Sequence, residues 1–137
     1  PLQIKDIPND NTDLLDWVNT HVNNRTLDVP GNKSIIEYFD EVVAQRSNHA
    51  ALVMNGLTMS YETLQHYVNK IARILTSKGI VRGQRIALLV ERSFEMIAAM
   101  LAAVKLGAVY VPIDTDCPKK RREIILEDAQ IVPIMSF

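Results

Sequence analysis

The stretch Lys105–Asp114, KLGAVYVPID, decides the fold of this 137-residue chain. Gly107 stands where a helix would end, because glycine adopts the left-handed cap conformation without a Cβ clash. The apolar run over 108–113 then predicts a buried strand, in which Pro112 fits only where the ladder ends or lies at an edge. Asp114 follows that strand, at the kind of position where α/β folds place their ligands.

Strands and helices alternate on both sides of this stretch. The apolar run 85–90 predicts a buried parallel strand, and the nearly all-apolar segment 93–106 predicts a helix. A helix over 119–128 and a strand over 131–135 are expected after Asp114. Helices of this length suit right-handed crossovers between parallel strands. The predicted fold class is therefore α/β, a partial doubly wound parallel sheet with flanking helices.

An N-terminal hairpin is expected before the parallel sheet. Asn55-Gly56 joins the β-prone runs 50–54 and 57–61, a strong signal for a two-residue turn. Ser34 and Glu37 form a Ser-x-x-Glu capping box, which predicts a helix with a continuous apolar stripe. The stripe comprises Ile35, Ile36, Phe39, Val42 and Val43. A second helix is predicted after Ser60, with Leu64, Val68, Ile71 and Leu75 buried and Gly79 at its end.

The first 33 residues differ from the rest. They are rich in Asn, Asp, Thr, Pro and Gly, and hold at most one short helix, which Thr12 could cap. We therefore expect residues 1–33 to form a linker or wrapping arm and residues 34–137 to form the folded segment.

The composition is that of a globular protein. Hydrophobic residues make up 47% and charged residues 23%, and the net charge is -1, so bulk charge recruits neither nucleic acid nor an anionic membrane. The longest apolar run, Met96–Val104, is too short to span a bilayer. Cys117 is the one cysteine, which favours a reducing compartment and a cytoplasmic location.

Charged side chains stand at two expected strand ends. Glu91 and Arg92 could form a catalytic ion pair, although a brace or a solvated pair is the more common outcome. Asp114 and Asp116 could bind a metal, but carboxylates before a helix more often accept backbone N–H bonds, so we favour capping.

Three further features of the sequence could be sites. The run Lys119–Arg122, KKRR, could bind an anion at a helix N-terminus, but we favour a solvated face because one short run shapes no pocket. Cys117 lacks a convincing catalytic partner, and His21, His49 and His66 lack metal-ligand spacing. There is no G-x-x-x-x-G-K, G-x-G-x-x-G or nucleophile elbow. We assign no catalytic, cofactor-binding or metal-ligating residue.

The sequence resembles the beginning of an adenylation domain of nonribosomal peptide synthetases, in the AMP-forming acyl- and aminoacyl-activating superfamily. LTMSYETL (57–64) is similar to the first family motif, Leu-Thr-Tyr-x-Glu-Leu. The segment 91–129 resembles the following part of the domain, and within it Lys105, Gly107, Tyr110, Val111, Pro112, Ile113, Asp114, Pro118 and Arg121 match the second motif, Leu-Lys-Ala-Gly-x-Ala-Tyr-Val-Pro-Ile/Leu-Asp-Pro followed by a Pro and an Arg. NRTLDVPGNKSIIEYF (24–39) resembles the linker from a condensation domain. Thr63, Thr115 and Cys117 depart from the usual Glu, Pro and Tyr, which affects capping and packing.

The resemblance implies an ATP-dependent reaction in the complete domain. A carboxylate, usually of an amino acid, would be adenylated with release of pyrophosphate and then passed to the phosphopantetheine thiol of a carrier protein. ATP and Mg²⁺ are expected for that domain, and the motifs that would hold them are absent from these residues. We therefore expect a scaffold segment that is incomplete relative to the family's large domain and inactive alone.

The resemblance also implies partners: the remainder of the adenylation domain and neighbouring condensation and carrier domains. An uncovered sheet edge and an apolar helix would make the isolated chain self-associate. Two alternatives stay open, a segment of an acyl- or aryl-CoA ligase and a standalone interaction module. The amino-acid substrate is not specified by these residues.

Overall fold

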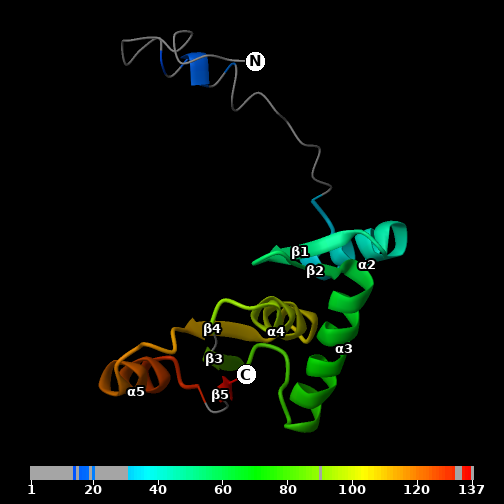
Figure 1. The fold of residues 1–137 in the computed structure, drawn as a ribbon. Helices are drawn as coiled ribbons and strands as arrows, with labels where there is room; N and C mark the ends of the chain where they lie inside the picture. The colour runs from blue at the N-terminus through cyan, green and yellow to red at the C-terminus, as the bar shows by residue number, and fades with distance from the viewer. Residues whose placement is uncertain are drawn as a thin grey trace. The chain divides into compact units, whose positions relative to one another are not determined.

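The computed structural model describes residues 14, 16–18, 20, 31–89 and 91–131, and the backbone of 134–136 (Figure 1). The chain divides into two compact units, Pro1–Asn32 and Lys33–Phe137. In the first unit residues 14, 16–18 and 20 are helical and residues 31 and 32 lie in a turn, while Thr12, the predicted cap, lies outside the described residues. The second unit contains α2 (Ile35–Arg46), β1 (Ala50–Met54), β2 (Leu57–Ser60), α3 (Tyr61–Ser77), β3 (Arg85–Leu89), α4 (Phe94–Lys105), β4 (Val109–Ile113), α5 (Lys119–Asp128) and β5 (Ile134–Ser136).

The parallel sheet has the strand order β4-β3-β5. The chain runs from the centre to one edge through α4, and then returns past β3 to the other edge through α5 (Figure 1). That reversal is the mark of a doubly wound sheet and confirms the predicted fold class. Pro112 lies in β4, an edge strand of the described sheet, so its missing N–H is tolerated there.

The predicted hairpin and capping box are both confirmed. β1 and β2 pair antiparallel around Asn55 and Gly56, whose φ angles of 51° and 77° are both left-handed. The Ser34 backbone N–H donates to Glu37 Oε2 at 2.6 Å, and the Glu37 N–H donates to Ser34 Oγ at 3.3 Å. The two groups therefore satisfy each other at the start of α2.

The core lies between α3, α4 and one face of the sheet. The apolar face of α3 is buried at the predicted positions Leu64, Val68, Ile71 and Leu75, while α4 buries four alanines, Ala98, Ala99, Ala102 and Ala103. Ile86 and Leu88 of β3 pack against these helices. Small side chains on α4 leave room for the larger ones of α3, and the three elements share one close-packed core.

The helices that lead into the sheet end in the same way. Gly79 and Gly107 have φ angles of 81° and 67°, and the following residues bond back to the helix, Ile80 N–H to Leu75 O at 3.1 Å and Ala108 N–H to Ala103 O at 2.9 Å. These are Schellman caps, as the glycines predicted. Just beyond them, two backbone bonds join the strand entrances: Gly83 N–H to Gly107 O and Val109 N–H to Gln84 O, both 2.8 Å.

Several boundary predictions were wrong. Ile35 is 66% exposed, because Phe39, one turn later, is the first α2 side chain packed against the core. Tyr61 begins α3 rather than ending β2, since Ser60 accepts the Thr63 N–H at 3.2 Å and so caps the helix. The last strand begins at Ile134, because Ile131 is still bonded to the end of α5.

Gly107 is the more restricted of the two cap glycines. A Cβ at Gly107 would lie 2.9 Å from Arg82 Cγ, whereas a Cβ at Gly79 would meet nothing within 4 Å. Gly79→Ala should cost only the left-handed backbone penalty, about 1 kcal/mol, and Gly107→Ala about 2 kcal/mol or more. Urea unfolding of the two variants measures the difference. Equal losses of unfolding free energy in the two variants would show that the Arg82 side chain moves away from the added Cβ at no cost.

The capping box makes α2 sensitive to acid. Hydrogen bonds from the Ser34 backbone N–H and then its hydroxyl hold the pKa of Glu37 below its ordinary value of 4.5. A lowered folded-state pKa contributes stability that is present above the ordinary value and lost as pH falls through the folded one. Glu37→Gln keeps an acceptor but no charge. The wild type should exceed it in unfolding free energy near neutral pH and converge with it in acid, whereas a gap independent of pH would contradict this.

Candidate functional site

The carboxyl edge of the sheet is the first place to look for a site. β3 and β4 are parallel, with Leu89 opposite Ile113, so the residues after the two strands meet at one edge, as the sequence predicted. They line a shallow hollow of ≈ 410 Å³. Its lining consists of Glu91, Arg92, Met96, Pro112, Ile113, Asp114, Thr115 and Asp116. Acidic and basic groups are thus gathered here, and their contacts decide what they can do.

Glu91 and Arg92 do not form a pair. Both are exposed, and among the described residues the ion pairs within 4.0 Å are Lys33–Glu41 and Lys119–Glu123. Neither a catalytic pair nor a structural brace is therefore made by these two side chains, and the solvated alternative describes them.

Asp114 orders a turn and does not cap α5. Its Oδ1 accepts the Asp116 N–H at 2.9 Å, and its carbonyl accepts the Cys117 N–H at 3.0 Å. The residue at the N-cap of α5 is Pro118, with no side-chain capping bond. The capping prediction was wrong because the Asp114 carboxylate is used two residues along the chain, in an Asx turn, before the helix begins.

The basic run at the start of α5 is mostly solvated. Lys119 lies 3.9 Å from Glu123, with 82% and 62% of the two side chains exposed, so the pair contributes little. Arg121 lines a second hollow of ≈ 370 Å³ beside Asp114 and Cys117. Cys117 is free and half-buried, and its Sγ lies 3.9 Å from the Pro118 carbonyl. This arrangement supplies no activated nucleophile.

The described residues do not fit the phosphates of ATP or its magnesium ion. The five glycines lie before α2, in the hairpin turn, at the ends of α3 and α4, and before β3, so none follows a strand into a helix N-terminus. A phosphate loop needs glycine at that junction. Among the described residues no group of three or more His, Cys, Asp or Glu side chains is placed to hold a metal. No helix in this part of the chain is long and apolar enough to cross a membrane.

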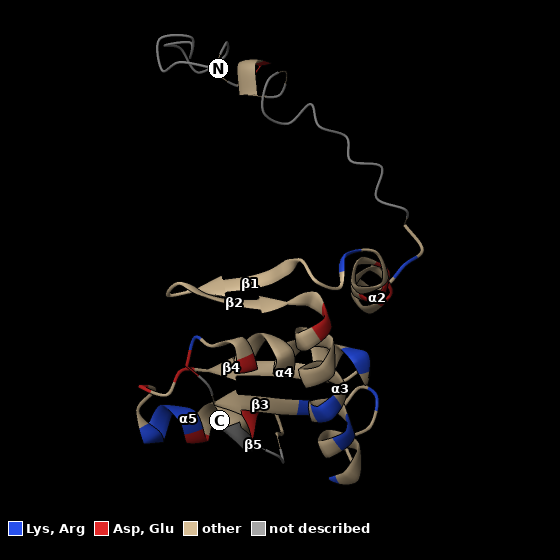
Figure 2. Ribbon diagram, turned by 45° about the vertical axis from the view of Figure 1, so that its right-hand side comes forward, with Lys and Arg blue, Asp and Glu red and all other residues tan. Residues whose placement is uncertain are grey.

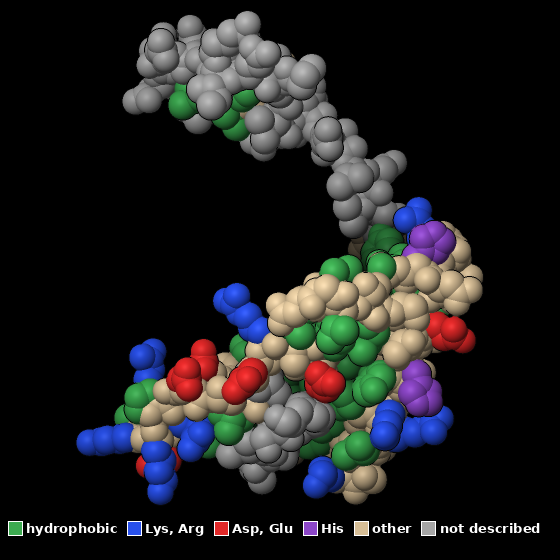
Figure 3. All heavy atoms as spheres, viewed as in Figure 1, with side chains coloured by type: hydrophobic (Ala, Val, Ile, Leu, Met, Phe, Trp, Pro, Cys, Tyr) green, Lys and Arg blue, Asp and Glu red, His purple; other side chains and the backbone are tan. Residues whose placement is uncertain are grey.

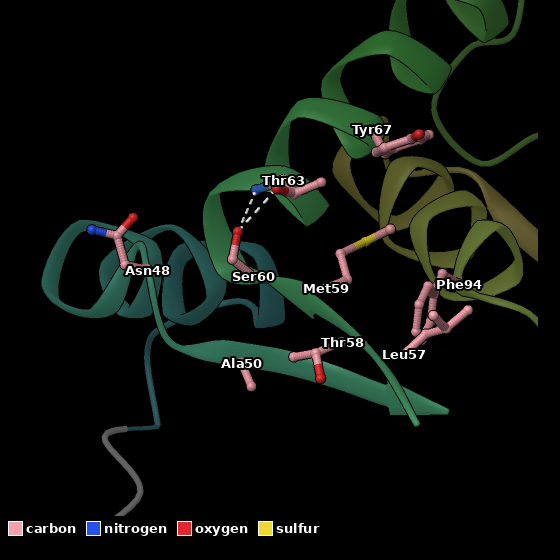
Figure 4. A pocket seen from close by; sticks show the side chains of 9 residues that line it. All are labelled: Asn48, Ala50, Leu57, Thr58, Met59, Ser60, Thr63, Tyr67 and Phe94. Atoms are coloured by element: carbon pink, nitrogen blue, oxygen red, sulfur yellow. Dashed lines mark hydrogen bonds between the residues drawn. The ribbon is translucent and has the colours of Figure 1, made fainter. Parts of the chain in front are cut away.

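A hollow that the sequence did not indicate lies beside the hairpin. It measures ≈ 500 Å³, and Figure 4 shows Leu57 and Phe94 lying together at one side of it. Thr63, which replaces the acidic residue of the first family motif, bonds to the Ser60 hydroxyl at 2.9 Å near the same hollow (Figure 4). Most of its lining residues come from the contiguous stretch 48–67, which includes β1, β2 and the start of α3, and Phe94 of α4 joins them from a distant part of the sequence, so no local motif could reveal the hollow. None of them is charged, and the hollow has no acid–base capacity.

Comparisons with known proteins agree with one another. A family model described as "AMP-binding enzyme" matches residues 39–136. Bacitracin synthase 1 of Bacillus licheniformis is 38% identical over 116 residues, which are 85% of this chain and 2% of that protein. Gramicidin S synthase 1 of Brevibacillus brevis is 37% identical over 109 residues, 80% of this chain and 10% of that protein. The chain thus spans a tenth or less of these two relatives.

Solved structures show the same likeness. The artificially fused adenylation–PCP di-domain NpsA-ThdA from Klebsiella oxytoca matches with a TM-score of 0.72 and 28% identity, covering 76% of this chain and 20% of that chain. The NpsA N-terminal subdomain in complex with 3-hydroxyanthranilyl-AMSN matches with a TM-score of 0.71 at the same identity, covering 27% of that chain.

The role of Asp114 can be tested by exchanging its acceptor. Asp114→Asn retains an oxygen for the Asp116 N–H and should leave stability nearly unchanged, whereas Asp114→Ala should lose up to about 1 kcal/mol of unfolding free energy. Magnesium titration should shift the melting temperature of neither variant nor of the wild type. A magnesium-dependent shift that only the wild type shows would instead establish a metal site.

Proposed function

Because the chain belongs to the family of AMP-binding enzymes, we propose that residues 34–137 form the N-terminal scaffold of an adenylation domain in a nonribosomal peptide synthetase. The observation that carries this proposal is the family match over 39–136, which includes the hairpin, the parallel sheet and both crossover helices. The relatives over this span include peptide synthetases that make bacitracin and gramicidin S.

The complete domain would activate an amino acid as its adenylate and load it onto the phosphopantetheine thiol of a carrier domain. ATP and Mg²⁺ would be used by that domain, and the residues of this segment take no chemical step in it. Their contribution is to build β3 and β4 and to bring the carboxyl ends of these strands to one edge, where parallel α/β sheets bind ligands.

The two parts of the chain have different proposed roles. Residues 1–33 serve as a linker to a preceding condensation domain, and residues 34–137 as part of the adenylation domain. Exposed apolar side chains at 71% for Val53, 65% for Leu57 and 51% for Ile124 support a further proposal, that the isolated chain self-associates or packs against the remainder of its domain. The cytoplasmic location stays a prediction.

A segment exchange tests the scaffold role. Residues 39–136 should replace the matching segment of gramicidin S synthase 1 and leave amino-acid-dependent ATP–pyrophosphate exchange within about tenfold of the parent, since the fold of the segment is shared. The matched control is the same exchange carrying Gly107→Val, which should lose activity because Arg82 and the left-handed φ exclude a branched side chain.

The isolated 137-residue chain should show no exchange above background and should sediment as more than a monomer. Amino-acid-dependent exchange by the isolated chain would refute the scaffold role. The scaffold role would also be refuted if the synthetase carrying the exchanged segment were folded but inactive, and if its Gly107→Val variant had the same activity.

A further inference from the structure

Charge is segregated along the chain in a way that the proposed function does not use. The sequence has 16 acidic residues, yet none lies between Thr63 and Val90 or between Met96 and Ile113. Six cations occupy those two acid-free stretches, and all six are exposed. They are Lys70, Arg73, Lys78, Arg82, Arg85 and Lys105. In Figure 3, blue side chains and no red ones lie over the end of α3 that is farther from the hairpin.

Two of these cations border a groove between α3 and α4. The α3–α4 groove, a hollow of ≈ 580 Å³, is lined by Asn69, Ala72, Arg73, Thr76, Ser77 and Lys105. The five α3 residues are spaced i, i+3, i+4, i+7 and i+8, so they share one face of the helix. Lys105, the last residue of α4, donates from Nζ to Asn69 Oδ1 at 2.9 Å and thereby holds its ammonium group beside that face.

The two cations of the α3–α4 groove are not paired with any acidic side chain in the described part of the chain. Thr76 Oγ1 donates to the Ala72 carbonyl at 2.9 Å, and Ser77 Oγ donates to the Ile74 carbonyl at 2.8 Å, so both hydroxyl protons are turned to their own helix. Lys105 keeps two further N–H donors, and Arg73 keeps its whole guanidinium. In the described part of the chain, neither has a carboxylate within 4.0 Å.

Ordinary helix electrostatics explains only part of this pattern. Lys105 lies in the last turn of α4, where a cation complements the helix dipole. Arg73 does not, because the last turn of α3 contains no basic residue. An acid four residues away on the same helix could pair with a cation, but Arg73 has Asn69 and Ser77 at those positions. Arg73 therefore remains uncompensated.

We propose that the α3–α4 groove is a docking site for an acidic helix of a neighbouring protein domain. Its lining includes Ala72 and Thr76, small residues that admit a helix face, and the exposed cations Arg73 and Lys105, which can bind carboxylates. A guanidinium fork binds a carboxylate through two parallel hydrogen bonds. The lining has no aromatic side chain on which a nucleic-acid base could stack, which favours a protein partner.

Peptide binding to the full 137-residue chain tests this proposal. The probe is a fluorescein-labelled amphipathic helical peptide with Glu at i and i+4, compared with the same peptide carrying Gln and with an oligothymidylate of equal net charge. Fluorescence anisotropy should show that the Glu peptide binds at least about fivefold more tightly than either of the others, because only it offers carboxylates on a helix.

Variants locate the site. The double variant Arg73→Gln, Lys105→Gln should weaken Glu-peptide binding by about fivefold or more, and the matched control Lys119→Gln, Lys120→Gln on α5 by less than about twofold. Thr76→Glu adds an acid at an exposed position of the groove lining, leaves both cations in place, and should weaken binding as strongly. Circular dichroism melting confirms that each variant is folded.

Three outcomes would overturn the proposal: no measurable Glu-peptide binding, equal weakening by the groove and α5 variants, or tighter binding of the oligothymidylate. The last would indicate a nucleic-acid surface. This readout is independent of pyrophosphate exchange, so an active segment exchange without peptide binding would refute the docking site alone.

Discussion

The close approach of α4 to α3 and the sheet is the constraint on which the rest of the unit depends. Four fully buried alanines form the contact face of α4, and the branched side chains of α3 fill the space they leave. A larger residue at any of these four positions would push the helices apart or force strained rotamers. The same contact brings the end of α4 close to α3, where Lys105 Nζ donates to Asn69 Oδ1 at 2.9 Å. Figure 2 shows α4 beside α3, with blue Lys and Arg positions along α3.

The sequence predicted the order of the elements because the residues that begin and end them act locally. Ser34 with Glu37, Asn55-Gly56, and the glycines at 79 and 107 each act through a few neighbouring backbone groups, and all behave as expected. Predictions failed where a nonlocal or competing contact decides. Ile35 is exposed because Phe39 is the first α2 side chain packed against the core, and the Asx turn uses the Asp114 carboxylate before α5 begins. The α3–α4 groove needs the relative placement of two helices, which no periodicity contains.

The carboxyl edge of the sheet forms a hollow at the usual ligand position of an α/β fold, although the described residues around it form no catalytic pair. Parallel pairing alone brings the ends of β3 and β4 together, and the sequence could predict that meeting. It could not predict that Glu91 and Arg92 stay apart, because side-chain pairing depends on rotamers and solvent. The α/β scaffold and the reactive groups are therefore separable, in keeping with a chain whose matched relatives are many times longer.

The two backbone bonds at the amino edge of the sheet, between Gly83 and Gly107 and between Gln84 and Val109, bear on how the chain finds its fold. They join the two ends of the β3–α4 segment just before the paired residues of β3 and β4 begin. A slip of one residue would turn Ile86 and Leu88 away from the helices and expose them. Gly107 accepts one of these bonds and also ends α4, so the same residue terminates the helix and aligns the two strands. The two bonds at the entrance of the strands and the ladder between β3 and β4 thus specify the same registry, with Arg85 opposite Val109.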